Sequence, residues 1–279
     1  MKELHDVDLK KYTTIRIGGV AETMLVPETT DELLNIIKKY SPKYLIGGGS
    51  NLLINERKFD LVVDLRSFDL SISDLGEGKF SVGGSVRLQK LINTINEKGY
   101  GGIEYLYSVP GLVGGSIAMN AGGGRKSQLY ISNYLVSVKA IVNGELVTLT
   151  KDECKFEHRS SIFKHSTSIV VSALFQFPEK SKEETEKMKK DRLEFCRRVQ
   201  DNSAPNFGSV FMLYNLKILQ LTQKLKIGNR KAHFSGKTVN WILNEDKADF
   251  SDVMSAMRKV EFLHKILGKK CKREIIVWD

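Results

Sequence analysis

Two glycine-rich loops are the features of this sequence whose residue types and spacing could do chemistry. The first reads GGGSN over residues 47–51, and the second reads PGLVGGSIAMNAGGG over residues 110–124. Ordered glycine costs backbone entropy, so clusters of three need a reason. Their bare backbone N–H groups suit anion-binding nests for phosphates. Together the loops favour a pyrophosphate site, although each loop alone is also typical of a structural turn.

Neither loop matches the common phosphate-binding motifs. No GK[ST] sequence follows either loop, and the GxGxxG spacing of a Rossmann fold is not matched cleanly. The three cysteines, Cys154, Cys196 and Cys271, are far apart and lack any CxxC spacing. This pattern predicts reduced, packed thiols rather than a disulfide framework or a zinc site, and we expect no bound metal.

The length and the hydropathy of the chain limit the classes of protein to which it can belong. A chain of 279 residues suits two or three small domains. No apolar run approaches the length that spans a bilayer, and the polar start MKELHDVDLKKYTT is unlike a secretory signal. We therefore expect a cytoplasmic protein with no membrane partner.

The net charge of +10 is concentrated in the last third of the chain. From residue 179 to the end there are 22 Lys and Arg against 14 Asp and Glu. Such a field could attract nucleic acid, acidic lipid or an anionic small molecule such as a nucleotide sugar. The mixed charges of KSKEETEKMKKDRLEFCRR also fit a solvated helix face, which we favour for that stretch.

The elements that must position these loops alternate between strands and helices. Strands are predicted for TTIRIGG at 13–19, AETMLVP, KYLIGG and FDLVVDL, with a helix in TTDELLNIIKKY that has an N-cap Thr, early acids and late lysines. KFSVGGSV, YLVSVKAIV, GELVTLT and SIVVSALFQF follow as strands, and RLQKLINTINEKGY as a helix. Later helices are predicted near 180–200, 215–226 and 250–267, and strands near 238–243 and 273–278. The predicted domains are 1–66, 67–178 and 179–279.

Six blocks, in order, resemble the UDP-N-acetylenolpyruvoylglucosamine reductase family of FAD enzymes. They are TTIRIGG, GGGSNLLI at 47–54, GIEYLYSVPGLVGGSIAMNAGG at 102–123, FEHRSSIFK at 156–164, FGSVF at 207–211 and REIIV at 273–277. The resemblance covers nearly the whole chain. It implies an α+β protein with an FAD-binding fold of two α/β subdomains, as in vanillyl-alcohol oxidase, followed by a smaller α/β substrate-binding domain.

The resemblance also implies the residues that hold FAD. The two loops would approach the pyrophosphate and the flavin edge, where a side chain on a first-loop glycine would occupy the space of the cofactor. Neither loop contains a His or Cys for covalent attachment, so we expect noncovalent FAD reduced by NADPH. The expected FAD-binding residues are Arg16, Gly47, Gly48, Gly49, Ser50, Asn51, Ser108, Val109, Pro110, Gly111, Gly114, Gly115, Ser116, Ala118, Asn120 and Gly122.

Three residues match the catalytic positions of the family. Arg159 would stabilise the substrate carboxylate as charge develops, since a planar guanidinium pairs with two oxygens. Ser209 would protonate the enol intermediate, and Glu274 would help polarise the carboxylate while holding a proton, because burial there would raise its pKa. Each residue could also be purely structural: Arg159 as a surface arginine, Ser209 as part of a Gly-Ser turn, and Glu274 as a glutamate on an edge strand.

The likeness weakens in the substrate domain. Met212, Leu213 and Tyr214 replace the usual KNP, Thr238 replaces a histidine, and His158 stands where tyrosine is common. A tyrosine-bearing lid after Phe163 is expected to be absent. The expected substrate-binding residues are Asn240, Lys237 and Tyr214.

Three hypotheses follow. The first is the family reaction, NADPH-dependent reduction of UDP-N-acetylglucosamine enolpyruvate by a monomer that binds a nucleotide sugar. The second, prompted by the altered substrate motifs, is a paralogue acting on another nucleotide-activated sugar in surface polysaccharide synthesis. The third is a flavin or nucleotide module whose basic domain binds nucleic acid, which the absence of an aromatic-rich RNA-binding signature disfavours.

Overall fold

The structure, a computed structural model, describes residues 1–123, 128–164 and 166–279. The chain forms two compact units, each assembled from three segments. Unit 1 comprises Met1–Leu4, Thr23–Gly48 and Leu61–Cys196, and unit 2 comprises His5–Glu22, Gly49–Asp60 and Arg197–Asp279. The predicted boundaries near residues 66 and 178 fall inside unit 1, and the three-domain division stays a prediction.

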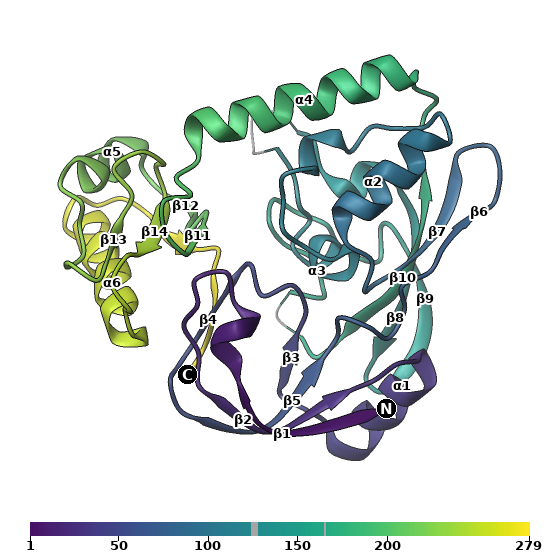
Figure 1. The fold of residues 1–279 in the computed structure, drawn as a ribbon, viewed down its shortest axis with the longest axis horizontal. Coiled ribbons are helices and arrows are strands. Elements are labelled where there is room, and N and C mark those ends of the chain that lie inside the picture. Colours follow the sequence, from purple (N-terminus) through teal and green to yellow (C-terminus); the bar gives the residue numbers. More distant parts are fainter. Residues whose placement is uncertain (124–127, 165) are drawn as a thin grey trace. The chain divides into compact units, whose positions relative to one another are not determined.

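A four-stranded sheet has the order β1-β2-β5-β3 (Figure 1). Its strands are β1 (Lys2–Asp8), β2 (Val20–Val26), β3 (Tyr44–Ile46) and β5 (Lys58–Asp64), and β3 and β5 are parallel. Between β2 and β3, helix α1 (Thr30–Tyr40) begins after Thr29, whose hydroxyl accepts from the Glu32 N–H at 3.1 Å. The helix predicted from this N-cap and its charge pattern is confirmed.

The larger sheet of unit 1 is antiparallel, with the order β6-β7-β10-β8-β9. Its strands are β6 (Ile72–Asp74), β7 (Lys79–Gly83), β8 (Leu135–Val142), β9 (Glu145–Thr150) and β10 (Ile169–Gln176). Helices α2 (Leu88–Glu97) and α3 (Val113–Ala118) bury apolar residues in one core with this sheet, and α3 packs on β7 and β10. Helix α4 (Lys182–Val199) starts in unit 1 and its last turn belongs to unit 2.

Unit 2 surrounds a second core. A sheet of order β11-β14-β13 contains Asn206–Gly208, Trp241–Asn244 and Ala232–Phe234. Strand β12 (Phe211–Leu213) pairs with β15 (Lys272–Arg273), and β4 (Leu52–Ile54) pairs in parallel with β16 (Ile276–Trp278). Helices α5 (Leu216–Lys224) and α6 (Phe250–Ile266) lie side by side, and α6 packs on β13 (Figure 1).

The strand predicted over residues 13–19 is wrong. This segment is a turn followed by irregular backbone, in which Arg16 has a positive φ of 58°. Ile15 and Ile17 are fully buried in the core of unit 2 while Arg16 is exposed. The alternation of apolar and polar residues therefore imitates a strand without forming one.

Candidate active site

Within unit 1, the first two glycines of the first loop lie against the second loop. A Cβ atom placed on Gly48 would lie 3.4 Å from the Cα of Gly111 and 3.5 Å from the carbonyl of Pro110. A Cβ placed on Gly47 would lie 3.6 Å from the side chain of Leu112. Segments that are more than sixty residues apart in the sequence thus form one glycine-lined wall.

This wall offers unpaired hydrogen-bond donors. Within the described part of the chain, the backbone N–H groups of Gly47, Gly48, Leu112 and Gly115 have no hydrogen-bond partner. A Cβ on Gly115 would meet nothing within 4 Å, so the surface beside it is open. Backbone donors without partners beside open space suit an anion such as a pyrophosphate.

Some of the predicted FAD-binding glycines are required by the packing of the chain itself rather than by a ligand. Gly49, in unit 2, has a φ of +63°, and its Cβ would lie 1.7 Å from the carbonyl oxygen of Tyr12. For Gly49, then, the chain itself excludes a side chain, whereas the expectation was that the cofactor would. Gly114 and Gly122 are similarly confined, by Gly84 O at 3.1 Å and by Leu129 O at 2.2 Å respectively.

Two predicted FAD-binding residues, one just before the second loop and one within it, serve packing. The Ser108 hydroxyl accepts from Nε of Arg192 at 2.8 Å and from Sγ of Cys196 at 3.1 Å, so it anchors α4. Ser116 is buried, and its carbonyl accepts from the N–H of Ala121 at 2.8 Å. Val109 and Pro110 lead into the wall, and Gly124, the last residue of the loop, lies outside the described residues.

Arg159 is held by the end of the same loop. Its Nη2 donates to the carbonyl of Gly122 at 3.1 Å, and its own carbonyl accepts from Nζ of Lys164 at 3.0 Å. Two further bonds join these segments, from Asn120 Nδ2 to Glu157 O at 2.9 Å and from Ser161 Oγ to Ala118 O at 2.8 Å. The MNAGG and HRSSIFK segments are therefore held together by hydrogen bonds.

Two buried polar atoms near Arg159 belong to side chains for which the sequence predicted no unpaired buried group. The Asn120 Oδ1 and the Tyr105 hydroxyl are buried with no hydrogen-bond partner among the described residues. Burial raises the pKa of Tyr105 well above its ordinary value, with Tyr134 and Glu104 adding to the rise and Arg159 opposing it. Each of these atoms is open to a ligand: the Asn120 Oδ1 suits a ring N–H, and the Tyr105 hydroxyl suits a C=O group.

In unit 2, Ser209 lies in the short connection between β11 and β12. Gly208, which precedes it through a cis peptide bond, lies opposite Trp241, and a Cβ there would be 2.0 Å from the indole. The carboxamide of Asn240 binds Phe211 on both sides, accepting from its N–H at 2.9 Å and donating to its carbonyl at 2.8 Å. The Asn240 carbonyl also accepts from the Val210 N–H at 2.9 Å.

Glu274 is fixed beside this connection. Its N–H donates to the carbonyl of Val210 at 2.8 Å, and its carbonyl accepts from Nδ2 of Asn51 at 3.1 Å. The N–H of Ile276 donates to Asn51 O at 3.0 Å. Backbone and side-chain hydrogen bonds in unit 2 thus link the segments that carry three predicted site residues, Ser209, Glu274 and Asn51. Ser50 directly precedes Asn51 in the chain.

The remaining predicted residues of unit 2 are less closely grouped. Lys237 donates from Nζ to the carbonyl of Arg197 at 3.1 Å, and Tyr214 is exposed just after β12. Thr238, which replaces the family histidine, donates from its hydroxyl to Val199 O at 2.7 Å. These contacts tie the 235–238 loop to the end of α4. Arg159 belongs to the other unit.

Unit 1 holds the groups that would bind FAD. The four unpaired N–H groups of the wall provide donors for phosphate oxygens, and Asn120 Oδ1 provides an acceptor for a ring N–H. The residues present therefore fit FAD. Among the described residues, no cluster of three or more His, Cys, Asp or Glu side chains is arranged to hold a metal ion. The three cysteines are free thiols, and burial raises the pKa of Cys154 to about 11 and of Cys271 to about 12.

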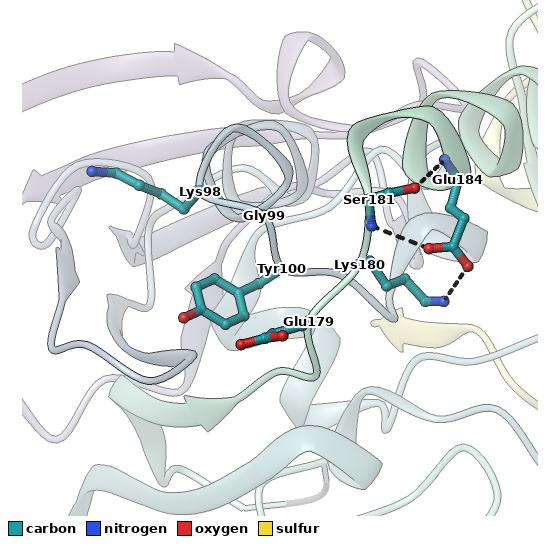
Figure 2. A pocket seen from close by; sticks show the side chains of 7 residues that line it. All are labelled: Lys98, Gly99, Tyr100, Glu179, Lys180, Ser181 and Glu184. Carbon is teal, nitrogen blue, oxygen red and sulfur yellow. Dashed lines mark hydrogen bonds and ion pairs between the residues drawn. The ribbon is translucent and has the colours of Figure 1, made fainter.

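A separate pocket of about 400 Å³ lies at the start of α4 (Figure 2). The Ser181 N–H donates to Glu184 Oε2 and the Glu184 N–H donates to Ser181 Oγ, both at 3.1 Å. Lys180 pairs with the same carboxylate at 3.6 Å. This reciprocal pair is the capping box of α4, and the pocket contains none of the predicted site residues. We assign it no ligand.

Comparison with known proteins adds two independent findings. A family model described as an FAD binding domain matches residues 21–150. The UDP-N-acetylenolpyruvoylglucosamine reductase of Pelagibacter ubique is 32% identical over 279 residues, covering 95% of this chain and 89% of that protein. The protein of the same name from Bacillus subtilis is 28% identical over 273 residues, covering 93% and 88%.

A solved structure extends the likeness to the fold. The UDP-N-acetylenolpyruvylglucosamine reductase of Thermus caldophilus matches with a TM-score of 0.82 at 24% identity, covering 100% of this chain and 98% of that one. Together with the FAD binding domain, this match confirms the predicted fold class.

Proposed function

Because this chain belongs to the UDP-N-acetylenolpyruvoylglucosamine reductase family, we propose that it is an NADPH-dependent flavoenzyme of peptidoglycan precursor synthesis. Its substrate is UDP-N-acetylglucosamine enolpyruvate and its product is UDP-N-acetylmuramate. The observation that carries this proposal is the linkage of Glu274 to the carbonyl of Val210, directly after Ser209. Motif residues 65 positions apart in the sequence meet there, as one reaction centre requires.

FAD is held noncovalently by the glycine wall of unit 1 and by the polar groups around Asn120. When bound, it supplies the hydride for reduction of the enolpyruvyl double bond, after NADPH has reduced it. Arg159 binds the substrate carboxylate and stabilises the negative charge that develops there. Its guanidinium donates to the carbonyl of Gly122 and its backbone carbonyl accepts from Lys164, so the guanidinium starts from a defined position.

Ser209 donates its hydroxyl proton to the substrate carbon that does not receive the hydride. A serine hydroxyl is a weak acid, so the transfer depends on a strongly basic carbon and on correct placement. The bonds from Asn240 to Phe211 and Val210 supply that placement. Glu274, carrying a proton, helps to polarise the substrate carboxylate.

The test is NADPH oxidation by the FAD-loaded enzyme, measured with and without UDP-N-acetylglucosamine enolpyruvate. We expect oxidation that depends on the substrate, with a product two hydrogens heavier by mass spectrometry. Substrate-independent oxidation, unchanged by this compound, would overturn the assignment. Parallel reactions with other UDP-sugars test the paralogue hypothesis, which the altered residues Tyr214 and Thr238 motivate.

The proposal requires one copy of the chain, a nucleotide sugar and two nucleotide cofactors. We expect a cytoplasmic monomer with no nucleic-acid partner, and the chemistry itself needs no membrane. Of the helices in the described ranges, none has the length and apolar character needed to cross a bilayer.

A further inference from the structure

Several exposed apolar side chains of unit 2 lie on the solvent face and at the C-terminal end of α6. Phe262 is 61% exposed, Ile266 one turn later is 59% exposed, and Leu267 at the helix end is 55% exposed. The core face of the same helix carries Val253, Met257, Val260 and His264, all buried. Phe262 and Ile266 lie one turn apart on the helix face opposite to the core. Packing within unit 2 therefore does not account for these apolar side chains.

Basic side chains surround this apolar stripe. Between residues 253 and 273 there are seven Lys and Arg and one acid, Glu261, whose carboxylate pairs with Arg273 at 2.7 Å. Neighbouring α5, which contacts α6, adds exposed Leu221 and Leu225, and residues 216–231 hold five Lys and Arg and no acid. We call the exposed basic and apolar residues of these two contacting helices and their C-terminal ends the α5–α6 surface: Lys217, Leu221, Lys224, Leu225, Lys226, Arg258, Lys259, Phe262, Lys265, Ile266, Leu267, Lys269 and Lys270.

We propose that the α5–α6 surface docks unit 2 on an anionic phospholipid bilayer, with Phe262, Ile266 and Leu267 entering the interface and the lysines contacting lipid phosphates. Helices that present apolar side chains within a field of Lys and Arg lie in the plane of such interfaces. Anionic headgroups attract each nearby Lys or Arg. This proposal departs from the expectation that the protein has no membrane partner.

The charge pattern favours a bilayer over the other occupants. Protein interfaces are depleted in lysine, and a second copy of this surface would set like charges against one another. Nucleic acid would account for the lysines and for Phe262, on which a base can stack, but it gains little from the aliphatic side chains of Ile266 and Leu267. A lipid surface uses both kinds of residue.

The proposed docking residues lie on the face of α6 that points away from the Ser209 connection. The buried face of α6 shares one core with Phe207, Val210 and Phe211, the residues that flank Ser209. Phe262 and Ile266 lie on the opposite face of that helix. Docking through this surface would therefore not require Ser209 to move.

The test is co-sedimentation of the FAD-loaded full chain with vesicles of equal parts phosphatidylcholine and phosphatidylglycerol, against vesicles of phosphatidylcholine alone. We expect binding only to the anionic vesicles, weakened by added NaCl. Replacing Lys265 and Lys269 with Gln should weaken the partition roughly fivefold per lysine, the equivalent of about 1 kcal/mol each. The double variant Phe262→Ser, Ile266→Ser should reduce binding further.

Matched controls separate this surface from general effects. Leu75, 58% exposed in unit 1, is changed to Ser, and exposed Lys151 is changed to Gln. Thermal unfolding confirms that each variant is folded. No binding to anionic vesicles, or equal loss in the controls, would overturn the proposal. So would concentration-dependent dimerisation abolished by Phe262→Ser, or DNA binding that depends on Lys265 but not on Phe262.

Discussion

The backbone N–H of Glu274 donates to the carbonyl of Val210 at 2.8 Å, which ties the acid near the C-terminus to the residue that follows Ser209. Strands β12 and β15 continue this link, since Phe211 lies opposite Arg273. Neither backbone segment can shift far without breaking this pairing. The proposed proton donor and the proposed carboxylate ligand are therefore held by one short piece of sheet.

Ser209→Ala should abolish most turnover while leaving the flavin reaction with NADPH intact. General acid catalysis typically contributes about 100- to 10,000-fold, so we expect kcat to fall by a factor in that range. Rapid-mixing absorbance of the flavin measures its reduction separately. Ser251→Ala, a serine at the start of α6, serves as the control and should keep normal turnover. Normal turnover in Ser209→Ala would remove the proton-donor role.

Gly47→Ala and Gly49→Ala should fail in different ways. A Cβ on Gly47 meets only ordinary contact at 3.6 Å, so the protein should fold normally but bind FAD about tenfold more weakly, or about 1.4 kcal/mol. A Cβ on Gly49 collides with Tyr12 O, and the φ is positive, so folding stability should fall by about 3 kcal/mol. Urea unfolding of the FAD-free protein and flavin titration measure the two effects. Unchanged FAD affinity in Gly47→Ala would argue against the glycine wall as the cofactor site.

Asn240→Ala should reduce both stability and turnover, because it strips two buried hydrogen bonds from Phe211. Each buried group left without a partner costs about 1–3 kcal/mol. The matched control is Asn244→Ala, which also removes two buried bonds, to Ile15 O and from Ala248 N, but none that binds Phe211. Because Asn240 also has a positive φ of 68°, which Ala tolerates less well than Asn, we expect stability to fall in both variants but more in Asn240→Ala. We expect kcat at saturating substrate to fall more in Asn240→Ala than this stability difference accounts for. Equal kcat values would make Asn240 a purely structural residue.

Asp201 should make stability depend on acid pH. Burial alone would raise the pKa of this carboxyl, but the hydroxyls of Ser235 and Ser203 and the charge of Lys237 outweigh burial and hold the pKa below its ordinary value. A lowered folded-state pKa stabilises the protein above the unfolded-state pKa of about 3.9, and this contribution disappears as the pH falls through the folded-state value.

The variant Asp201→Asn should therefore be less stable than the parent by about 1 kcal/mol at pH 7, a figure that follows from the lost charged hydrogen bonds. The difference between the two proteins should shrink below about pH 4. Unfolding in urea at several pH values measures it, with Asp60→Asn at an exposed position of β5 as the reference. A difference that stays constant down to pH 3 would show that the carboxylate charge is unimportant there.

Local patterns were enough to predict α1, because Thr29 caps its first turn and lysines occupy its last one. The segment around Arg16 misled the same reasoning, since Ile15 and Ile17 are buried from a turn rather than from a strand. The resemblance to the family supplied the candidate residues. It did not supply the contact between Gly48 and Gly111, which depends on packing between distant segments.

The sequence also could not predict that the hydroxyl of Tyr105 and the Oδ1 of Asn120 are buried without hydrogen-bond partners among the described residues. Neither residue type signals burial without a partner, so only the fold reveals them. Conversely, Asn240 and Lys237, expected at the substrate, have backbone partners in unit 2. For Asn240 we now propose a positioning role for the connection that carries Ser209.

The most direct measurement of the central claim is a single turnover without oxygen. The FAD-loaded enzyme is reduced with one equivalent of NADPH, and UDP-N-acetylglucosamine enolpyruvate is then added while the flavin absorbance is followed. We predict prompt reoxidation in the parent protein and very slow reoxidation in Ser209→Ala and Glu274→Gln. A flavin that NADPH reduces but this substrate does not reoxidise would contradict the assignment of the reaction.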